Sequence, residues 1–405
     1  MRKHTLFICA ALASLSMQAQ KNLRIWQHGE DKVVKVTEAG EMKVSGTSIT
    51  IAGKTYQMSA IDSIIVVPQV TVAYNGATAS VSIPASVAAD VTATVSGADV
   101  VITNKNVSNE CEFVVSGTST NGSLTYNGSY KTTLILDGLN LTSTKGAPLD
   151  IQCGKRVALQ LAAGTNNSLA DAANGAQKAC LYCKGHLEVE GSGSLTVTGN
   201  ARHAIATKEY LQLKKSTGNI TIAKAASDGI HAGQYFQMNG GIVTFDGNTM
   251  ADGIQAEAIL KSDGTIDPAE ENNGQVIIKG GTIKGTITHE DCKAIKADTD
   301  IAVSGGTISI NAQGNGSRGI QTDGSMTISE ADNTTTIDIA AAGGLCTLKE
   351  CVDDPHRCMG IKVDGNLTVT GGTTTVTNTG KKSRGIKVGG IYSKTGGTVN
   401  GTVSQ

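Results

Sequence analysis

A short repeated phrase limits what this chain can fold into. The phrase is Gly-Ile or Ala-Ile, and it recurs in a regular series at Ala204-Ile205, Gly229-Ile230, Gly253-Ile254, Ala294-Ile295, Gly319-Ile320, Gly360-Ile361 and Gly385-Ile386. Successive isoleucines are 25, 24, 41, 25, 41 and 25 residues apart, and Leu181 extends the series 24 residues upstream. Each gap of 41 equals one period of 25 plus an insertion of 16 residues. A fixed period of this length predicts a repeat fold in which each unit stacks on its neighbours.

A second phrase falls about midway between these positions. It reads Gly240-Gly241-Ile242, Gly280-Gly281-Thr282-Ile283, Gly305-Gly306-Thr307-Ile308, Gly371-Gly372-Thr373 and Gly396-Gly397-Thr398-Val399. About 24 residues accommodate three short strands and three turns, and stacked coils would lie about 4.8 Å apart. With 49 glycines and only 3% aromatic residues, the chain can fill a thin aliphatic core but not a deep aromatic one. We therefore predict an all-β fold, a right-handed single-stranded parallel β-helix with three faces.

The rest of the sequence predicts four segments. Residues 1–19 have a basic start and a short apolar run, which is typical of a secretory signal peptide, so the chain is expected to be exported to the periplasm, the cell surface or the medium. Residues 20–67 predict a small β-meander that serves as an adaptor. Residues 70–130 predict a β-rich entry cap, and residues 131–405 the β-helix, with insertions at 261–274 and 341–357. No later apolar run is long enough to span a membrane.

Eight cysteines follow the expected signal peptide, and an even number in an exported chain favours disulfides. Cys153 and Cys183 fall near equivalent positions of neighbouring coils and are expected to pair, with Cys180 as an alternative partner. The second insertion is expected to be tied down by Cys346, Cys351 and Cys358.

Carboxylates gather in two columns of the repeat. Immediately before the repeated phrase stand Asp228 and Asp252, and three residues after its isoleucine stand Glu257, Asp298, Asp323 and Asp364. Like charges at this spacing repel unless water, a base or a divalent cation lies between them. Calcium prefers such oxygen ligands, and its candidate ligands are Asp228, Asp252, Glu257, Asp298, Glu290 and Asp291. The alternative is that they are solvated turn residues, because Asp-Gly is a common turn pair.

Lys293 follows Asp252 by one coil in the column that precedes the phrase. Beside an acidic sugar bound through calcium, a lysine could remove the proton next to the carboxylate. The alternative is a structural lysine that neutralises its acidic neighbours. No dense run of Lys and Arg indicates a nucleic-acid or membrane surface, and the net charge is −1.

Several stretches resemble a known family. They are Thr133-Leu134-Ile135-Leu136-Asp137-Gly138-Leu139-Asn140-Leu141, Ala147-Pro148-Leu149, Gly191-Ser192-Gly193-Ser194-Leu195-Thr196-Val197, Asp228-Gly229-Ile230 and Asp252-Gly253-Ile254. The sequence over roughly 70–405 is similar to the carbohydrate-binding domain family of calcium-dependent parallel β-helices, itself related to polysaccharide lyase family nine. The resemblance implies calcium at acidic corners of adjacent coils and affinity for acidic or plant-type polysaccharide.

Three functions are compatible with these observations. The first is non-catalytic binding of a polysaccharide or other glycan. The second is a calcium-dependent uronate lyase that uses Lys293 as its base. The third is a structural or adhesive surface protein in which the β-helix is a stalk.

Overall fold

The computed structural model describes residues 21–27, 30–35, 43–51, 53–351 and 356–405, so the expected signal peptide lies outside the described residues. These residues are all-β, with two short 3-10 helices, η1 (Met58–Ala60) and η2 (Lys349–Cys351), and no α-helix. Within the described ranges, no helix has the length and apolar character needed to cross a bilayer. The chain divides into two compact units, residues 1–69 with 84–87, and residues 70–83 with 88–405.

The first unit consists of antiparallel strands. Its strands are β1 (Lys21–Gln27), β2 (Glu30–Lys35), β3 (Lys43–Ser45), β4 (Ser48–Ile51), β5 (Lys54–Gln57) and the beginning of β6 (Ser63–Asn75). Strand β1 pairs with both β2 and β6, while β4 pairs with β3 and β5. A small apolar cluster of Ile25, Ile49, Ile51, Tyr56 and Ile61 is buried here.

The second unit begins with hairpin strands and then coils. Its first strands are β7 (Thr78–Ser82), β8 (Val91–Ser96), β9 (Asp99–Asn104), β10 (Glu112–Ser119), β11 (Ser123–Gly128) and β12 (Thr132–Thr142). Strands β8 and β9 form an antiparallel hairpin, after which β9 pairs in parallel with β11, and β10 with β12. Parallel stacking therefore starts at Asp99, inside the segment expected to be a separate entry cap. The Gly-Ile phrase is absent from these first coils. The period of the phrase therefore predicts the later coils but not the first ones.

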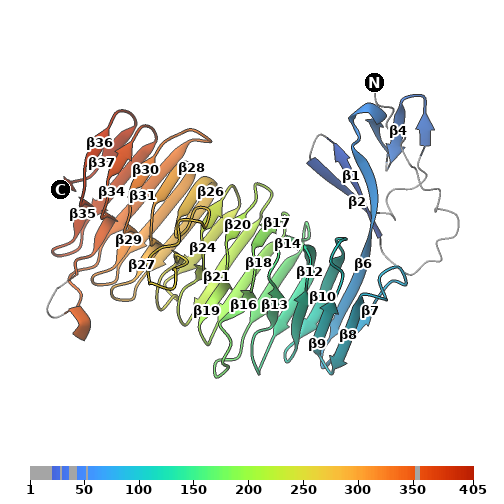
Figure 1. Cartoon of the computed structure of the whole chain (residues 1–405). Coiled ribbons are helices and arrows are strands. Elements are labelled where there is room, and N and C mark those ends of the chain that lie inside the picture. The colour runs from blue at the N-terminus through green and yellow to red at the C-terminus, as the bar shows by residue number, and fades with distance from the viewer. Residues whose placement is uncertain (1–20, 28–29, 36–42, 52, 352–355) are drawn as a thin grey trace. The chain divides into compact units, whose positions relative to one another are not determined.

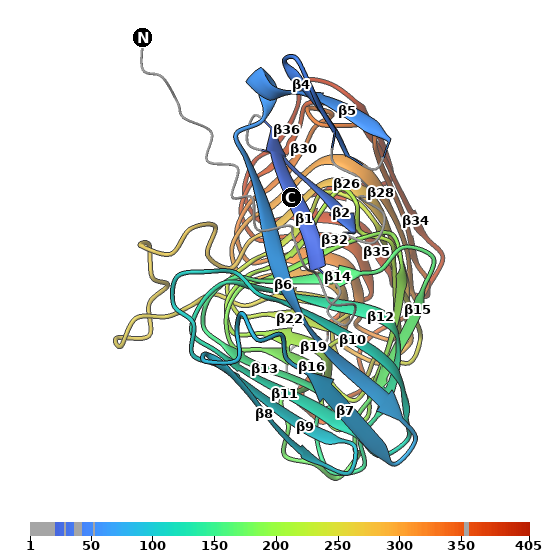
Figure 2. The same cartoon turned by 90° about the vertical axis from the view of Figure 1, so that its right-hand side faces the viewer.

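Each later coil adds one strand to each of three parallel ladders (Figure 1). The first ladder is a 13-stranded sheet that continues from β8, β9 and β11 through β13 (Leu149–Cys153), β16 (Ala179–Cys183), β19 (His203–Thr207), β22 (Ile230–Ala232), β25 (Ile254–Ala256), β27 (Lys293–Ala297), β29 (Arg318–Thr322), β32 (Met359–Val363), β35 (Arg384–Val388) and β38 (Val403–Ser404). Figure 2 shows the coils of this unit one behind another.

The other two ladders are joined in one sheet because β12, β26 and β28 are long enough to contribute to both. The second ladder contains β14 (Val157–Leu161), β17 (Leu187–Glu190), β20 (Leu211–Leu213), β23 (Phe236–Met238), β26 (Val276–Ile287), β28 (Ile301–Ala312), β30 (Met326–Ile328), β33 (Leu367–Val369) and β36 (Tyr392–Lys394). The third contains β15 (Asn166–Ala170), β18 (Ser194–Gly199), β21 (Asn219–Ala225), β24 (Ile242–Asp246), β31 (Thr335–Ala341), β34 (Thr373–Asn378) and β37 (Thr398–Asn400).

The predicted register of the repeated isoleucines is confirmed. Ile205 pairs with Ile230, and Ile230 with Ile254, and the same residue type continues to Ile386 without a shift. All seven isoleucines are at most 2% exposed. The hydrophobic effect fixes this register, because a slip of one residue would turn the isoleucines outward.

The second phrase marks a tight corner. Gly281 and Gly306, each the second glycine of its phrase, have φ of +88° and +92°. A Cβ atom added to Gly306 would lie 2.7 Å from the carbonyl oxygen of Gly281 in the preceding coil. The corner therefore requires glycine both for its backbone conformation and for the close approach of successive coils.

The two insertions leave the coil at opposite edges of the 13-stranded sheet. The first follows β25 and precedes β26, and it projects from the coil as the gold loop of Figure 2. The second follows β31 and precedes β32. Both loops therefore border the same sheet.

The disulfide in the structure matches the predicted cysteine pairs only in part. Cys346 and Cys351 form a disulfide within the second insertion, whereas Cys358 remains a thiol. Cys153 and Cys183 also remain buried thiols. Leu149 pairs with Leu181, so Cys183 lies opposite Ile151 rather than opposite Cys153. The predicted disulfide between Cys153 and Cys183 is wrong. To place these two cysteines opposite each other, β16 would have to shift by two residues relative to β13. Cys180, the alternative partner, is a buried thiol as well.

Candidate functional site

The outer face of the 13-stranded sheet carries one line of side chains in exact strand register. We call this line the outer column, and it consists of Asp150, Tyr182, Ala206, His231, Gln255, Lys296, Gln321, Lys362 and Lys387. Except for Tyr182 and Asp150, each of these residues immediately follows an isoleucine of the repeated phrase. Because neighbouring strands lie about 4.8 Å apart, the column presents polar groups at a regular vertical spacing.

A groove of about 520 Å³ lies at the beginning of the outer column. Tyr182 and Asp150 line it from the sheet, and Lys178 and Lys145 line it from the loops that precede the strands. The ammonium of Lys178 lies 5.3 Å from the centre of the Tyr182 ring, within the range of a cation–π contact. Gln152 donates to Asp150 Oδ1 at 2.8 Å, and burial raises the pKa of Asp150. An aromatic ring, a carboxylate, amides and ammonium groups therefore share one open groove.

The carboxylates that follow the sheet strands have protein partners along the edge of the outer column. Lys296 Nζ lies 3.5 Å from Asp298, and Lys362 Nζ lies 2.8 Å from Asp364. Gln321 donates to Asp323 at 3.2 Å. The sequence predicts a base, water or a cation between these like charges. In the structure, the groups beside them are mainly basic side chains of the outer column.

Two histidines and two carboxylates meet in the middle of the outer column. Asp228 Oδ2 lies 3.2 Å from His203 Nδ1 and 3.0 Å from His231 Nδ1. The other ring nitrogen of His231, Nε2, lies 3.0 Å from Glu257 Oε2. His203 begins β19, His231 lies in the next strand β22, and Glu257 follows β25, so three successive coils build the cluster.

Asp228 and Asp252 also tie successive coils together. Asp228 Oδ1 accepts the backbone N–H of Asp252 at 3.0 Å, and Asp252 Oδ1 accepts that of Lys293 at 2.7 Å. Burial opposes ionisation of Asp228, but the hydrogen bonds from His203 and His231 lower its pKa well below the usual range. Burial raises the pKa of Asp252 to about 6, although Lys293 opposes the shift.

The donors around Asp228 do not fit calcium. Calcium takes six to eight oxygen ligands. Here one carboxylate oxygen already accepts a backbone N–H, and the other faces two imidazole nitrogens. Of the remaining candidates, Asp298 Oδ2 accepts the N–H of Ala258 at 3.1 Å. In the described parts of the chain, only two groups of three His, Cys, Asp or Glu donors lie within 4.8 Å of one another, and both contain histidine.

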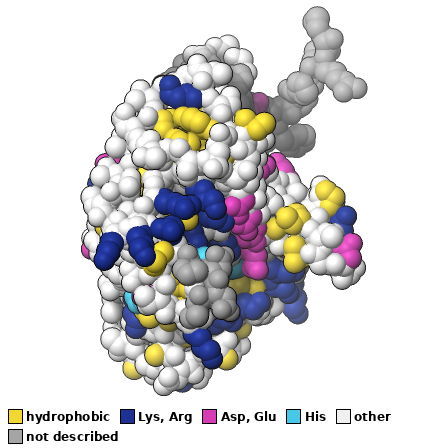
Figure 3. All heavy atoms as spheres, turned by 90° about the vertical axis from the view of Figure 1, so that its left-hand side faces the viewer, with side chains coloured by type: hydrophobic (Ala, Val, Ile, Leu, Met, Phe, Trp, Pro, Cys, Tyr) yellow, Lys and Arg dark blue, Asp and Glu magenta, His cyan; other side chains and the backbone are white. Residues whose placement is uncertain are grey.

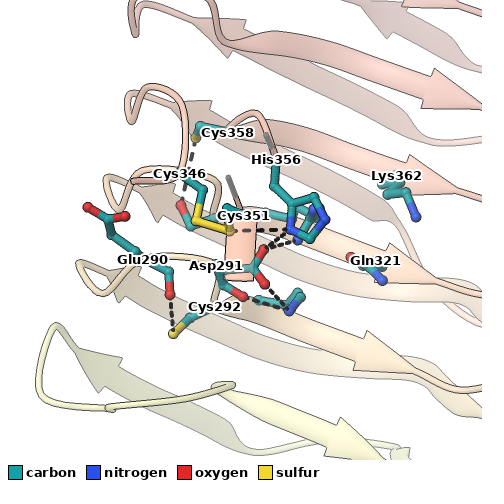
Figure 4. Close-up of polar contacts among 12 residues, drawn as sticks. Glu290, Asp291, Cys292, Gln321, Cys346, Cys351, His356, Cys358 and Lys362 are labelled. Carbon is teal, nitrogen blue, oxygen red and sulfur yellow. Dashed lines mark hydrogen bonds and ion pairs between the residues drawn. A yellow bond between two sulfur atoms is a disulfide. The ribbon is translucent and has the colours of Figure 1, made fainter. Parts of the chain in front are cut away.

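Glu290 and Asp291 hold the second insertion in place (Figure 4). Glu290 accepts hydrogen bonds from the backbone N–H and hydroxyl of Thr347, at 2.7 and 2.9 Å. Asp291 Oδ1 lies 2.8 Å from both Arg318 Nη1 and His356 Nδ1. Asp291 is partly buried, which disfavours its charge, yet Lys293, Arg318 and His356 together lower its pKa. These two carboxylates therefore act as anchors for a loop.

Lys293 belongs to this anchor. Its ammonium donates to the backbone oxygen of Asp291 at 2.6 Å and lies 3.6 Å from the Asp291 carboxylate. Both contacts hold the ammonium of Lys293 against Asp291. This arrangement is the one that the structural alternative for Lys293 predicts.

Lys and Arg side chains gather at the C-terminal end of the coil stack (Figure 3). Lys381, Lys382 and Arg384 are exposed in the coil that contains β35, and Lys387 belongs to the same strand. Only the fold shows that these side chains lie together on the end of the stack. An anionic polymer could contact this end through charge alone.

Sequence reasoning missed His231, Gln255 and the other members of the outer column as a set. The signal was present for all members except Asp150 and Tyr182, because each of the others follows a repeated isoleucine and must point outward when the isoleucine points inward. His203 stands immediately before Ala204-Ile205, in the same column as Asp228 and Asp252, but the sequence alone does not show which residues it contacts.

Comparisons with known proteins identify a family and a similar fold. The model of a family described as carbohydrate-binding domain-containing proteins matches residues 96–404. A carbohydrate-binding domain-containing protein of Acetivibrio thermocellus is 36% identical over 101 residues, which cover 23% of this chain and 35% of that protein. The chain thus spans about a third of the length of that relative. A polysaccharide lyase-like protein from C. thermocellum has a similar fold, with a TM-score of 0.52 and 24% identity over 65% of this chain and 98% of the other. The chain belongs to the family of carbohydrate-binding domain-containing proteins.

Proposed function

We propose that this is an exported, non-catalytic protein that binds acidic or plant-type polysaccharide along the outer face of the 13-stranded sheet of a right-handed parallel β-helix. The observation that carries the proposal is the groove at the start of the outer column, where Tyr182, Asp150 and Lys178 converge. Sugar-binding sites combine a flat apolar surface with a few polar groups that fix orientation, and the groove offers both.

Two further features support this face as the binding surface. The two insertions border it at opposite edges, and insertions in repeat folds often occupy the binding face. The outer column continues from the groove along the stack, so that an extended polymer could contact several coils. The disulfide between Cys346 and Cys351 supports export, because disulfides persist in oxidising compartments.

Acidic sugars are favoured by the lysines on this side of the coil. Lys145 and Lys178 line the groove, and Lys387 ends the outer column beside the exposed Lys381 and Arg384. Calcium stays a prediction from the sequence; of its candidate ligands, Glu257 and Asp298 follow the adjacent strands β25 and β27 of this sheet.

The test is binding of the purified chain to polygalacturonate and to cellulose, with calcium and with EDTA. We expect the Tyr182→Ala and Lys178→Ala variants to lose at least tenfold in affinity, equivalent to about 1.4 kcal/mol. Lys284→Ala is the charge-matched control, because Lys284 is exposed on β26 in the third ladder.

Absence of binding to any polysaccharide would overturn the proposed function. Binding that survives both groove substitutions but is lost in Lys284→Ala would move the binding surface to the third ladder. A loss of affinity in EDTA that added calcium restores, and added zinc does not, would support the predicted need for calcium.

A further inference from the structure

We propose that His203, Asp228 and His231 form a binding site for a zinc-type divalent cation, which goes beyond carbohydrate binding. The three donor atoms lie within 4.8 Å of one another. Asp228 Oδ2 is 3.2 Å from His203 Nδ1 and 3.0 Å from His231 Nδ1. Ligands at two corners of a tetrahedral zinc site, each about 2.0–2.1 Å from the metal, are about 3.3 Å apart. The two distances from Asp228 Oδ2 are close to this spacing.

His203 Nδ1 lies close to two groups of Asp228. It faces the backbone N–H of Asp228 at 3.3 Å, in the position where Asp228 and Asp252 accept the N–H of the next coil. It also lies 3.2 Å from the carboxylate oxygen Oδ2 of Asp228. Zinc at this carboxylate would take the single lone pair of Nδ1 in place of the long N–H contact.

The second ring nitrogen of His231 has the partner that a metal ligand needs. Its Nε2 lies 3.0 Å from Glu257 Oε2, while its Nδ1 points to Asp228. A histidine that binds metal through one nitrogen commonly donates the other N–H to a carboxylate, which fixes the tautomer and orients the ring. Glu257 therefore serves as a positioning residue, and its side chain is 55% exposed.

The donor set selects the class of metal. Two imidazole nitrogens and one carboxylate oxygen suit zinc and its neighbours among transition metals, whereas calcium needs an oxygen-rich shell. Three protein ligands leave one tetrahedral position for water or an added ligand. The His231 side chain is 18% exposed, so the group is accessible from the outer face of the sheet.

The other histidine-containing group provides a built-in control. Asp291, Cys351 and His356 also lie within 4.8 Å, but Cys351 is bonded to Cys346 and has no thiolate to offer. Asp291 is in addition bound to Arg318 at 2.8 Å. This second group is not expected to bind zinc in the oxidised protein.

The experiment uses the full chain, stripped with EDTA and dialysed, and titrated with ZnCl2 by calorimetry without polysaccharide. We expect one zinc per chain with a Kd below about 10 µM, and an absorption band of tetrahedral Co²⁺ when cobalt replaces zinc. Glu257→Gln should weaken zinc binding about 10- to 100-fold. His231→Gln should abolish it, and His356→Gln should leave it unchanged.

Absence of zinc binding, or binding that survives His231→Gln, would overturn the proposal. His231 and Glu257 lie on the outer face, so these variants can be compared with the native chain by their melting temperature in EDTA. Calcium titrated at the same concentration should release no heat from this site. Because no polysaccharide is present, failure of the zinc titration leaves the carbohydrate proposal intact.

Discussion

Asp291 Oδ1 accepts a hydrogen bond from His356 Nδ1 at 2.8 Å, across 65 residues of sequence. The contact joins the corner before β27 to the end of the second insertion, two coils further along the stack. Arg318 Nη1 reaches the same oxygen at 2.8 Å, and its side chain is only 5% exposed. One carboxylate therefore neutralises a buried guanidinium and fixes a loop.

Replacing Asp291 should destabilise the protein. In Asp291→Asn the guanidinium of Arg318 loses its charged partner, and we expect the free energy of unfolding at pH 7 to fall by about 1–3 kcal/mol. The folded pKa of Asp291 is lowered, so its contribution is present above the unfolded pKa of about 3.9 and is lost as the pH falls through the folded pKa. The difference from the native chain should therefore shrink below about pH 4. Urea unfolding at several pH values measures this.

Asp338→Asn is the matched control, because Asp338 is an exposed carboxylate on β31. Its effect should stay within about 0.5 kcal/mol. If Asp291→Asn and Asp338→Asn lower the free energy of unfolding equally at pH 7, the contact between Asp291 and Arg318 contributes no more to stability than a surface charge does.

The thiols provide a second prediction. Burial raises the pKa of Cys183 to about 12, and burial also raises that of Cys153. Because the thiolate is the reactive form, neither residue should be alkylated by iodoacetamide in the native protein at pH 8. Both should react after denaturation without a reducing agent, and mass spectrometry should find one disulfide, Cys346–Cys351. A peptide that links Cys153 to Cys183 would show that the register of β13 and β16 is incorrect.

The repeat could be predicted from sequence because one physical rule sets it. Isoleucines that stack in a buried ladder must recur at the length of one coil, and the spacing from Ile205 to Ile386 records that length directly. The first coils could not be predicted in the same way. Their buried positions hold residues such as Tyr126 and Val100 rather than the recurring phrase.

The candidate site was predictable only in part. Asp228 and Glu257 stood out as carboxylates, but a calcium site needs several free oxygen atoms in one place. The structure instead gives Asp228 two imidazole neighbours from adjacent coils. Spacing along the sequence shows which coils are adjacent, but it does not show which way a side chain turns at a corner. The contacts of His203 and Asp291 depend on the direction in which their side chains point.

A pair of neighbouring residues tests the alternation of inward and outward side chains. Ile361 is fully buried, whereas Lys362 is on the outer column and pairs with Asp364 at 2.8 Å. Ile361→Ala should lower the free energy of unfolding by about 2–5 kcal/mol through loss of buried surface and creation of a cavity. Lys362→Ala should cost less than about 1 kcal/mol, as expected for an exposed ion pair. Equal costs in urea unfolding would contradict the orientation of β32.

Gly306 provides the last prediction, because its corner leaves no room for a side chain. At φ +92° an alanine is strained, and its Cβ would lie 2.7 Å from the carbonyl oxygen of Gly281. Backbone strain of this kind costs about 1–3 kcal/mol, so Gly306→Ala should lower the melting temperature by several degrees. In Gly154→Ala the new Cβ would meet no atom within 4 Å, and this control should leave stability unchanged or slightly improved.

Since each coil rests on the one before it, the strain in Gly306→Ala should also appear as faster amide exchange in the paired residues Thr307 and Thr282, measured by mass spectrometry. If Gly306→Ala changes neither the melting temperature nor the rate of amide exchange, the corner can widen to hold a side chain. The close contact between successive coils would then not be the reason for glycine in the second phrase.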